Sequence, residues 1–187
     1  MRVIAGTCRG RTLAVPAGMT TRPTSDRAKE ALFSILSSRI DFLDARVLDI
    51  CAGTGSLGIE ALSRGAASCC FIEYGLSVKK ILDKNLQVTC FQDRSEIVQM
   101  DAVKAIRALS RRNLSFDLVF FDPPYASELY SQIPDSLDAS GLLAPAATLV
   151  VECSSRSTQP ESYGRLKKID RRIYGETAFE LFILEEK

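Results

Sequence analysis

From residue 45 onward, short apolar segments alternate with helical patterns, and this alternation limits the possible folds more than any other feature of the sequence. The predicted strands cover residues 46–50, 69–73, 96–100, 116–121 and 148–152. The first four strands are followed by predicted helices at 57–64, 76–88, 102–110 and 127–138. Repeated strand–helix units predict an α/β fold with a parallel sheet.

Different patterns precede and follow this series. Residues 1–5 and 11–15 are short extended stretches around a glycine-containing segment and predict a small hairpin. A loop then leads to a helix that begins near Thr24 or Ser25, either of which can cap it. At the other end, 165–174 and 177–185 flank Gly175 and predict an antiparallel pair. We therefore expect an N-terminal extension at 1–24 and a main domain at 25–187.

The charges are unevenly distributed, although the net charge is only +1. Residues 1–30 and 156–175 each hold six basic and two acidic side chains, a net of +4 in both cases. Two basic ends around an acidic middle favour contact with a polyanion outside the main domain. Solvated surface charge explains the same distribution, and charge alone does not separate the two interpretations.

Histidine is absent, and the six cysteines form no CxxC pair. The lack of histidine excludes His-based triads and argues against a catalytic metal. The cysteines fit free thiols of a reducing compartment, and no apolar run approaches the length of a membrane span. We expect a monomeric cytoplasmic protein.

A glycine loop follows the first strand of the series. Gly53, Gly55 and Gly58 form a GxGxxG between a strand and a helix, where glycine lets the backbone turn sharply and approach a ligand. Glu73, at the end of the next strand, has a carboxylate that can accept from ribose hydroxyls. These features fit NAD as well as S-adenosylmethionine.

Two further carboxylates favour S-adenosylmethionine. Asp49 precedes the loop, where it would attract a cationic methionine moiety and repel a pyrophosphate. Asp101 follows the third strand and can accept from an adenine amine. The predicted cofactor-binding residues are Asp49, Ala52, Gly53, Thr54, Gly55, Gly58, Glu73, Asp101 and Ala102.

The fourth strand ends in an acidic proline loop, with Asp122, Pro123, Pro124 and Tyr125 as the predicted catalytic residues. An aromatic amine is a poor nucleophile with two N–H donors, so a site that activates it needs acceptors. Asp122 supplies a carboxylate, and the prolines offer carbonyls without competing N–H groups. Tyr125 can stack on an extruded base. The pattern indicates methylation of an exocyclic base amine.

Three further segments resemble the bacterial RsmD family. They are 2–15 (RVIAGTCRGRTLAV), 22–27 (RPTSDR) and 57–65 (LGIEALSRG). The resemblance implies a Rossmann-like methyltransferase sheet of seven strands, mostly parallel with the last strand antiparallel, behind an N-terminal β-hairpin. It also implies methylation of guanine N2 in small-subunit ribosomal RNA. It places Arg22, Thr24 and Arg27 near the mouth of the active site.

We expect the RNA-binding residues to be Arg9, Arg11, Arg22, Thr24 and Arg27, because the extension that carries most of them is not needed by the cofactor fold. The expected substrate is a small-subunit particle or its assembly intermediate. Adenine-N6 methylation of RNA or DNA stays open, since the proline loop accepts either amine. A non-catalytic RNA-binding assembly factor is a second alternative. An NAD-dependent oxidoreductase is a third, which the Asp122 loop disfavours.

Overall fold

The computed structural model describes residues 1–16, 25–124 and 127–185. Its α-helices are α1 (Asp26–Ser37), α2 (Ser56–Ser63), α3 (Leu76–Thr89), α4 (Ala102–Leu109) and α5 (Leu129–Ser140). Its strands are β1 (Arg46–Ile50), β2 (Ser68–Ile72), β3 (Ser95–Val98), β4 (Phe116–Phe121), β5 (Leu143–Ser154), β6 (Ser162–Tyr163), β7 (Leu166–Tyr174) and β8 (Thr177–Leu184). Two short 3-10 helices are η1 (Gln92–Arg94) and η2 (Ser110–Arg112). Every predicted strand and helix of the alternating series is present, with ends displaced by a few residues.

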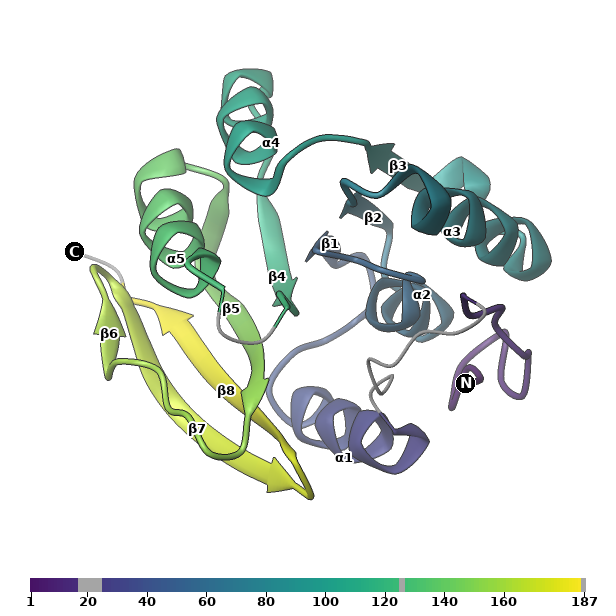
Figure 1. The fold of residues 1–187 in the computed structure, drawn as a ribbon, viewed down its shortest axis with the longest axis horizontal. Coiled ribbons are helices and arrows are strands. Elements are labelled where there is room, and N and C mark those ends of the chain that lie inside the picture. The colour runs from purple at the N-terminus through teal and green to yellow at the C-terminus, as the bar shows by residue number, and fades with distance from the viewer. Residues whose placement is uncertain (17–24, 125–126, 186–187) are drawn as a thin grey trace.

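All eight strands form one sheet in the order β3-β2-β1-β4-β5-β8-β7-β6 (Figure 1). The strands from β3 to β5 pair in parallel, and β8, β7 and β6 pair antiparallel. The parallel sheet and the antiparallel pair at the end of the chain are therefore confirmed. The expected number of seven strands is wrong by one, because Ser162 and Tyr163 fold back against Lys167 and Leu166 as a two-residue strand.

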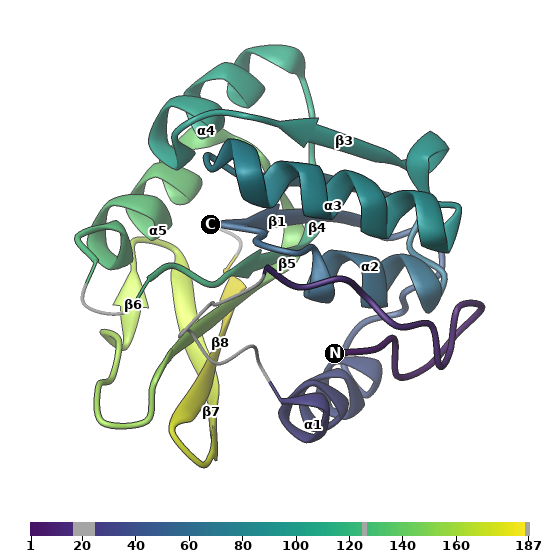
Figure 2. The ribbon, with the colours of Figure 1, turned by 45° about the vertical axis from the view of Figure 1, so that its right-hand side comes forward.

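Helices cover both faces of the parallel part of the sheet (Figures 1 and 2). On one face, apolar residues of α1, α2 and α3 pack with Phe120 of β4 and Val150 of β5. On the other face, α4 and α5 pack with Phe121 and Val151. Successive strand residues point to opposite faces, so a strand covered on both sides is apolar throughout. Within the described residues, every helix is too short or too polar to cross a lipid bilayer.

The N-terminal hairpin is reduced to one β-bridge, between Arg2 and Thr12. Hydrogen bonds also join its backbone to side chains of the main fold. The carboxylate of Glu60 in α2 accepts from the N–H groups of Ile4 (2.7 Å) and Ala5 (3.0 Å). The side chain of Asn85 in α3 accepts from the N–H of Ala14 (2.7 Å) and donates to its carbonyl (3.0 Å). The extension is thus bound tightly along α2 and α3.

Candidate active site

The glycine loop joins β1 to α2 at the carboxyl edge of the parallel strands. Gly53 and Gly55 have positive φ angles of 57° and 79°, which glycine adopts at little cost. A Cβ on Gly55 would lie 2.3 Å from Leu82, and one on Gly58 would lie 2.4 Å from the Phe71 ring. A Cβ on Gly53 would have only the Cys51 carbonyl within 4 Å, at 3.9 Å. Gly55 and Gly58 thus allow close packing, whereas Gly53 leaves room for a ligand.

Neighbouring segments hold the loop in place. The N–H of Ala52 donates to the Ile72 carbonyl at the end of β2 (3.0 Å). The carbonyl of the buried Thr54 accepts from the side-chain amide of Asn85 (2.9 Å). Because Asn85 also binds Ala14, one side chain connects the N-terminal extension to the glycine loop.

Glu73 directly follows β2, and its carboxylate is oriented by two backbone donors. One oxygen accepts from the N–H of Gly53 (2.9 Å) and the other from the N–H of Gly75 (2.7 Å). A carboxylate oxygen has two lone pairs, so each oxygen can still accept another hydrogen bond. The arrangement presents two acceptors beside Gly53, as binding of a ribose requires.

Asp49 is almost fully buried in β1 beneath the glycine loop, with 2% of its surface exposed. Its carboxylate accepts from the N–H of Gly58 (2.9 Å), in the first turn of α2. Burial raises the pKa of Asp49 to about 8, against a smaller opposing effect of the Gly58 N–H. The side chain is therefore bonded to the start of α2, and a cation bound above the loop would favour its ionised form.

Asp101 and Ala102 lie where β3 leads into α4. Asp101 is the N-cap of α4, and its carboxylate accepts from the N–H of Lys104 (3.1 Å). Ala102 is the first residue of α4, so its N–H has no partner within the helix. A carboxylate beside a free helix N–H can bind the donor and acceptor of an adenine edge.

The proline loop follows β4, on the side of β1 away from β2. The N–H of Asp122 donates to the Ile50 carbonyl (3.3 Å), while Pro123 is buried and Pro124 is exposed. The pKa of Asp122 is raised well above its usual range by burial, and then by the charges of Glu152 and Asp49. Tyr125 lies outside the described residues. Asp122 is thus an acceptor in an acidic environment.

Glu152 is a residue of this site that was not predicted from the sequence, although it ends the predicted strand 148–152 at the same sheet edge. It is 4% exposed in β5, the strand next to β4. An acidic residue at the carboxyl end of a strand was a signal available from the sequence. Its position beside Asp122 depends on the strand order, which the sequence pattern does not specify.

Arg9 and Arg27, two of the predicted RNA-binding residues, line one hollow of about 370 Å³ together with Arg2. Arg2 also forms an ion pair with Asp26 (3.2 Å). Arg11 is exposed on the same extension but is not part of the hollow. Arg22 and Thr24 lie outside the described residues. The structure therefore brings two of the predicted arginines, Arg9 and Arg27, together at one hollow.

The second basic region, 156–175, is largely neutralised. Carboxylates lie within 3.3 Å of five of its basic side chains, which are Arg165, Lys167, Lys168, Arg171 and Arg172. Most of these partners come from distant positions, such as Asp138 and Glu180. This region offers less charge to a polyanion than its sequence indicates.

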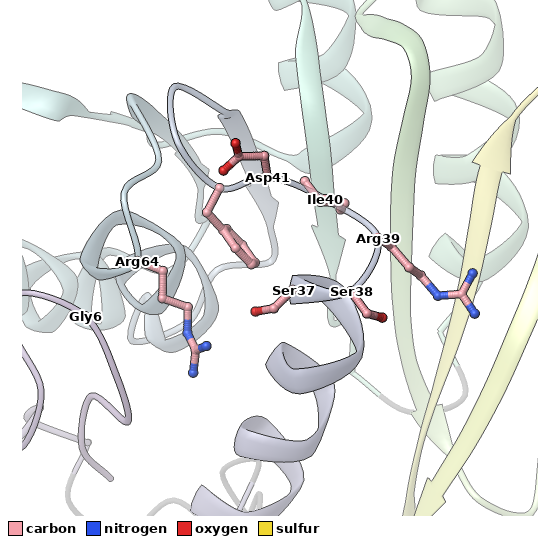
Figure 3. Close-up of a pocket in the computed structure, with 8 residues that line it drawn as sticks. Gly6, Ser37, Ser38, Arg39, Ile40, Asp41 and Arg64 are labelled. Carbon is pink, nitrogen blue, oxygen red and sulfur yellow. The ribbon is translucent and has the colours of Figure 1, made fainter.

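A larger cavity of about 670 Å³ lies at the end of α2 away from the glycine loop, between that end, Gly6 and the end of α1 (Figure 3). Its lining includes two arginines, and each guanidinium group is already paired. That of Arg64 pairs with Glu60 (2.9 Å) and lies over the Phe33 ring, and that of Arg39 pairs with Asp170 (3.2 Å). Because both are already paired, the cavity is a poor candidate for an anion site.

Over residues 1–183, the chain matches the family described as Conserved hypothetical protein 95. It is 35% identical over 97% of its length to the Ribosomal RNA small subunit methyltransferase D of Escherichia coli strain K12, of which 89% is covered. The chain belongs to this family, the RsmD family.

Solved structures agree with this relationship. The Escherichia coli protein yhhF has a TM-score of 0.86 and 34% identity, with 100% of this chain and 99% of that chain covered. A SAM Dependent Methyltransferase from Agrobacterium tumefaciens has a TM-score of 0.63 at 17% identity, over 84% of this chain and 62% of that one. At that identity the likeness shows only a shared fold.

Proposed function

We propose that the protein transfers a methyl group from S-adenosylmethionine to the exocyclic N2 amine of a guanine in small-subunit ribosomal RNA. The observation that carries this proposal is the order of the strand ends. Because β1 lies between β2 and β4, the glycine loop is flanked by Glu73 on one side and by Asp122 on the other. A cofactor bound at the loop therefore lies next to Asp122, a hydrogen-bond acceptor for the amine of the target base.

The residues of this edge fit S-adenosylmethionine. Glu73 offers two acceptors to the ribose, Gly53 leaves open space, and Asp101 with Ala102 can bind the adenine edge. The carboxylate of Asp49, beneath the loop, suits a cationic sulfonium and would repel the pyrophosphate of NAD. When bound, the cofactor supplies an electrophilic methyl group. The fold shared with a SAM-dependent methyltransferase agrees with this assignment.

Asp122 and the Pro123 carbonyl would bind the target amine. Two hydrogen bonds donated by the amine draw its nitrogen toward a tetrahedral geometry, and the lone pair can then point at the methyl group. Neither proline has an N–H that would compete for these acceptors. Tyr125, the fourth residue of the predicted loop, would stack on the flipped base.

The N-terminal arginines would dock the RNA. Arg9 and Arg27 line one exposed hollow, Arg11 is exposed nearby, and Arg22 and Thr24 belong to the segment between them in sequence. Beyond these arginines, the protein offers little surface that could recognise a base sequence. RNA recognition relies strongly on shape. We therefore infer that a monomer acts on a small-subunit particle or assembly intermediate. The name of the Escherichia coli relative supports ribosomal RNA as the substrate.

The test is a tritium-methyl transfer assay on small subunits from a strain that lacks this protein, beside free RNA and duplex DNA. The methylated nucleoside is identified by mass spectrometry. N2-methylguanosine formed preferentially on subunits supports the proposal. N6-methyladenine, or efficient methylation of duplex DNA, would instead support the adenine-N6 alternative. Cofactor binding without any transfer would support a non-catalytic assembly factor.

A further inference from the structure

Glu152 and Asp122 occupy equivalent positions on neighbouring strands. In the pairing of β4 with β5, Phe120 lies opposite Val150 and Phe121 opposite Val151. The next residues along these strands are Asp122 and Glu152. Because pairing strands in register brings side chains of one face within reach of each other, the two carboxylates are neighbours.

Both carboxylates also lie on the same face of the sheet. Phe120 and Val150 belong to the apolar core beneath α1, α2 and α3, and strand side chains repeat their direction every second residue. Asp122 and Glu152 therefore point toward that face, as does Asp49, which lies opposite Phe120. Glu152 is buried and Asp122 is half-buried, so the two carboxylates repel each other strongly when both are ionised, unless a cation lies beside them.

We propose that Glu152 acts with Asp122 as a carboxylate pair that receives the proton released by the target amine. This proposal rests on the proposed function. Asp122 contacts the amine, whereas Glu152 acts through Asp122 and is a positioning residue. The pair lets one carboxylate accept a hydrogen bond from the amine while its partner strengthens its affinity for a proton.

The charge balance of methyl transfer fits such a pair. The amine lone pair forms the N–CH₃ bond, and the electrons of the broken S–CH₃ bond return to sulfur. The positive charge thereby moves from sulfur to the nitrogen, which then loses a proton to Asp122. Before the step, a doubly ionised pair faces a cation. Afterwards, a pair sharing one proton faces a neutral thioether, so the net charge of the site is unchanged.

Other groups around the pair do not provide this proton acceptor. Asp49 binds the Gly58 N–H, and Glu73 binds those of Gly53 and Gly75. The Cys51 thiol at the end of β1 has its pKa raised to about 12 by burial and by neighbouring carboxylates.

Described residues of the surrounding elements either contact the pair or have partners of their own. From α5, the Tyr130 hydroxyl donates to the backbone carbonyl of Glu152 (3.0 Å). From β8, Phe179 lies opposite Glu152. From β7, Arg172 lies opposite Phe179 and pairs with Asp170, while Lys29 of α1 binds the Arg2 carbonyl, Ser56 and Glu60. Among the described residues, no basic side chain forms an ion pair with Asp122.

The first experiment measures proton release when the wild-type protein binds S-adenosylmethionine or S-adenosylhomocysteine. Calorimetry at pH 6 in two buffers of different ionisation enthalpy gives the number of protons, and both ligand amines are protonated at that pH. We expect the cationic ligand to release more protons, because the sulfonium favours the doubly ionised pair. Glu152→Gln should reduce this difference by at least about half. An unchanged difference in Glu152→Gln would assign the proton to Asp49 and overturn the proposal.

The second experiment measures single-turnover methyl transfer to small subunits between pH 5 and pH 9. In Glu152→Gln the acid limb of the pH–rate profile should move at least about one unit to lower pH, because Asp122 loses the neighbouring charge that raises its pKa. The plateau rate should fall about tenfold or more, since Asp122 becomes a weaker base. Affinity for S-adenosylhomocysteine should stay within about twofold, because its neutral thioether does not favour ionisation of the pair and Glu152 does not contact the ligand.

Two variants complete the design. Glu152→Asp keeps a carboxylate and should move the acid limb back toward the wild type. Asp117→Asn, at the amino end of β4, should match the wild type in both experiments. If the wild type methylates small subunits and Glu152→Gln has the same pH–rate profile, only the carboxylate pair is overturned. If the wild type does not methylate them, the proposed function is overturned. If Glu152→Gln does not fold, equal proton release for the two ligands in the wild type overturns the pair.

Discussion

Replacing Asp49 by asparagine should change how the stability of the ligand-free protein depends on pH. The folded-state pKa of Asp49 is about 8, raised from 3.8 mainly by burial. The folded protein therefore holds this proton more tightly than the unfolded chain does. The stability that the proton provides is present at low pH and is lost as the pH rises from about 4 through 8.

The size of the effect follows from the two pKa values. One unit of pKa difference corresponds to about 1.4 kcal/mol, so titration of Asp49 removes about 3 to 4 kcal/mol of stability between pH 5 and pH 8. Asparagine keeps an oxygen that accepts from the Gly58 N–H and carries no charge. The substitution leaves the buried amide N–H groups without a hydrogen-bond acceptor. This costs about 1 to 3 kcal/mol of stability, and the cost does not depend on pH.

Urea unfolding followed by circular dichroism at pH 5, 6.5 and 8 measures this difference. We expect the free energy of unfolding of the wild type to fall more steeply with pH than that of Asp49→Asn. Asp117→Asn is the control, because Asp117 is half-exposed and the Arg46 guanidinium helps to lower its pKa. Parallel pH profiles for the wild type and Asp49→Asn would show that Asp49 does not have a raised pKa in the folded protein.

Three further variants test the proposed site. Glu73→Ala should weaken S-adenosylmethionine binding by about 2 to 3 kcal/mol in calorimetry, because two charge-assisted hydrogen bonds are lost, and unchanged affinity would contradict this. Asp122→Ala should keep its cofactor affinity but slow methyl transfer at least about a hundredfold, and normal turnover would rule out the amine-activation mechanism. A quadruple variant replaces Arg9, Arg11, Arg22 and Arg27 by alanine. Each lost phosphate contact should reduce the salt slope of RNA binding by about 0.7 to 0.9, while Lys167→Ala, whose side chain pairs with a carboxylate, should change it less. RNA affinity equal to that of the wild type at low salt would argue against docking by these arginines.

Local sequence patterns predicted the helices and strands and the functional residues at the strand ends. The period of the apolar residues and the turn residues are local signals, so they predicted the strand–helix series and the antiparallel pair at the end of the chain. The same signals showed that Glu73 ends a predicted strand and that Gly53, Asp101 and Asp122 each follow one. Once the strands are parallel, these residues lie at one edge whatever the order of the strands.

Tertiary structure alone decided which of these residues are neighbours and which charges remain available. The order β1-β4-β5 and its register bring Glu152 beside Asp122 across 30 residues of sequence. Carboxylates outside the basic region 156–175, such as Glu180, form ion pairs that neutralise it. The side chains of Glu60 and Asn85 form hydrogen bonds with the backbone of the N-terminal extension. Strand order, burial and ion pairing depend on contacts between distant segments, whereas periodicity and turn chemistry record only the neighbourhood of each residue along the chain.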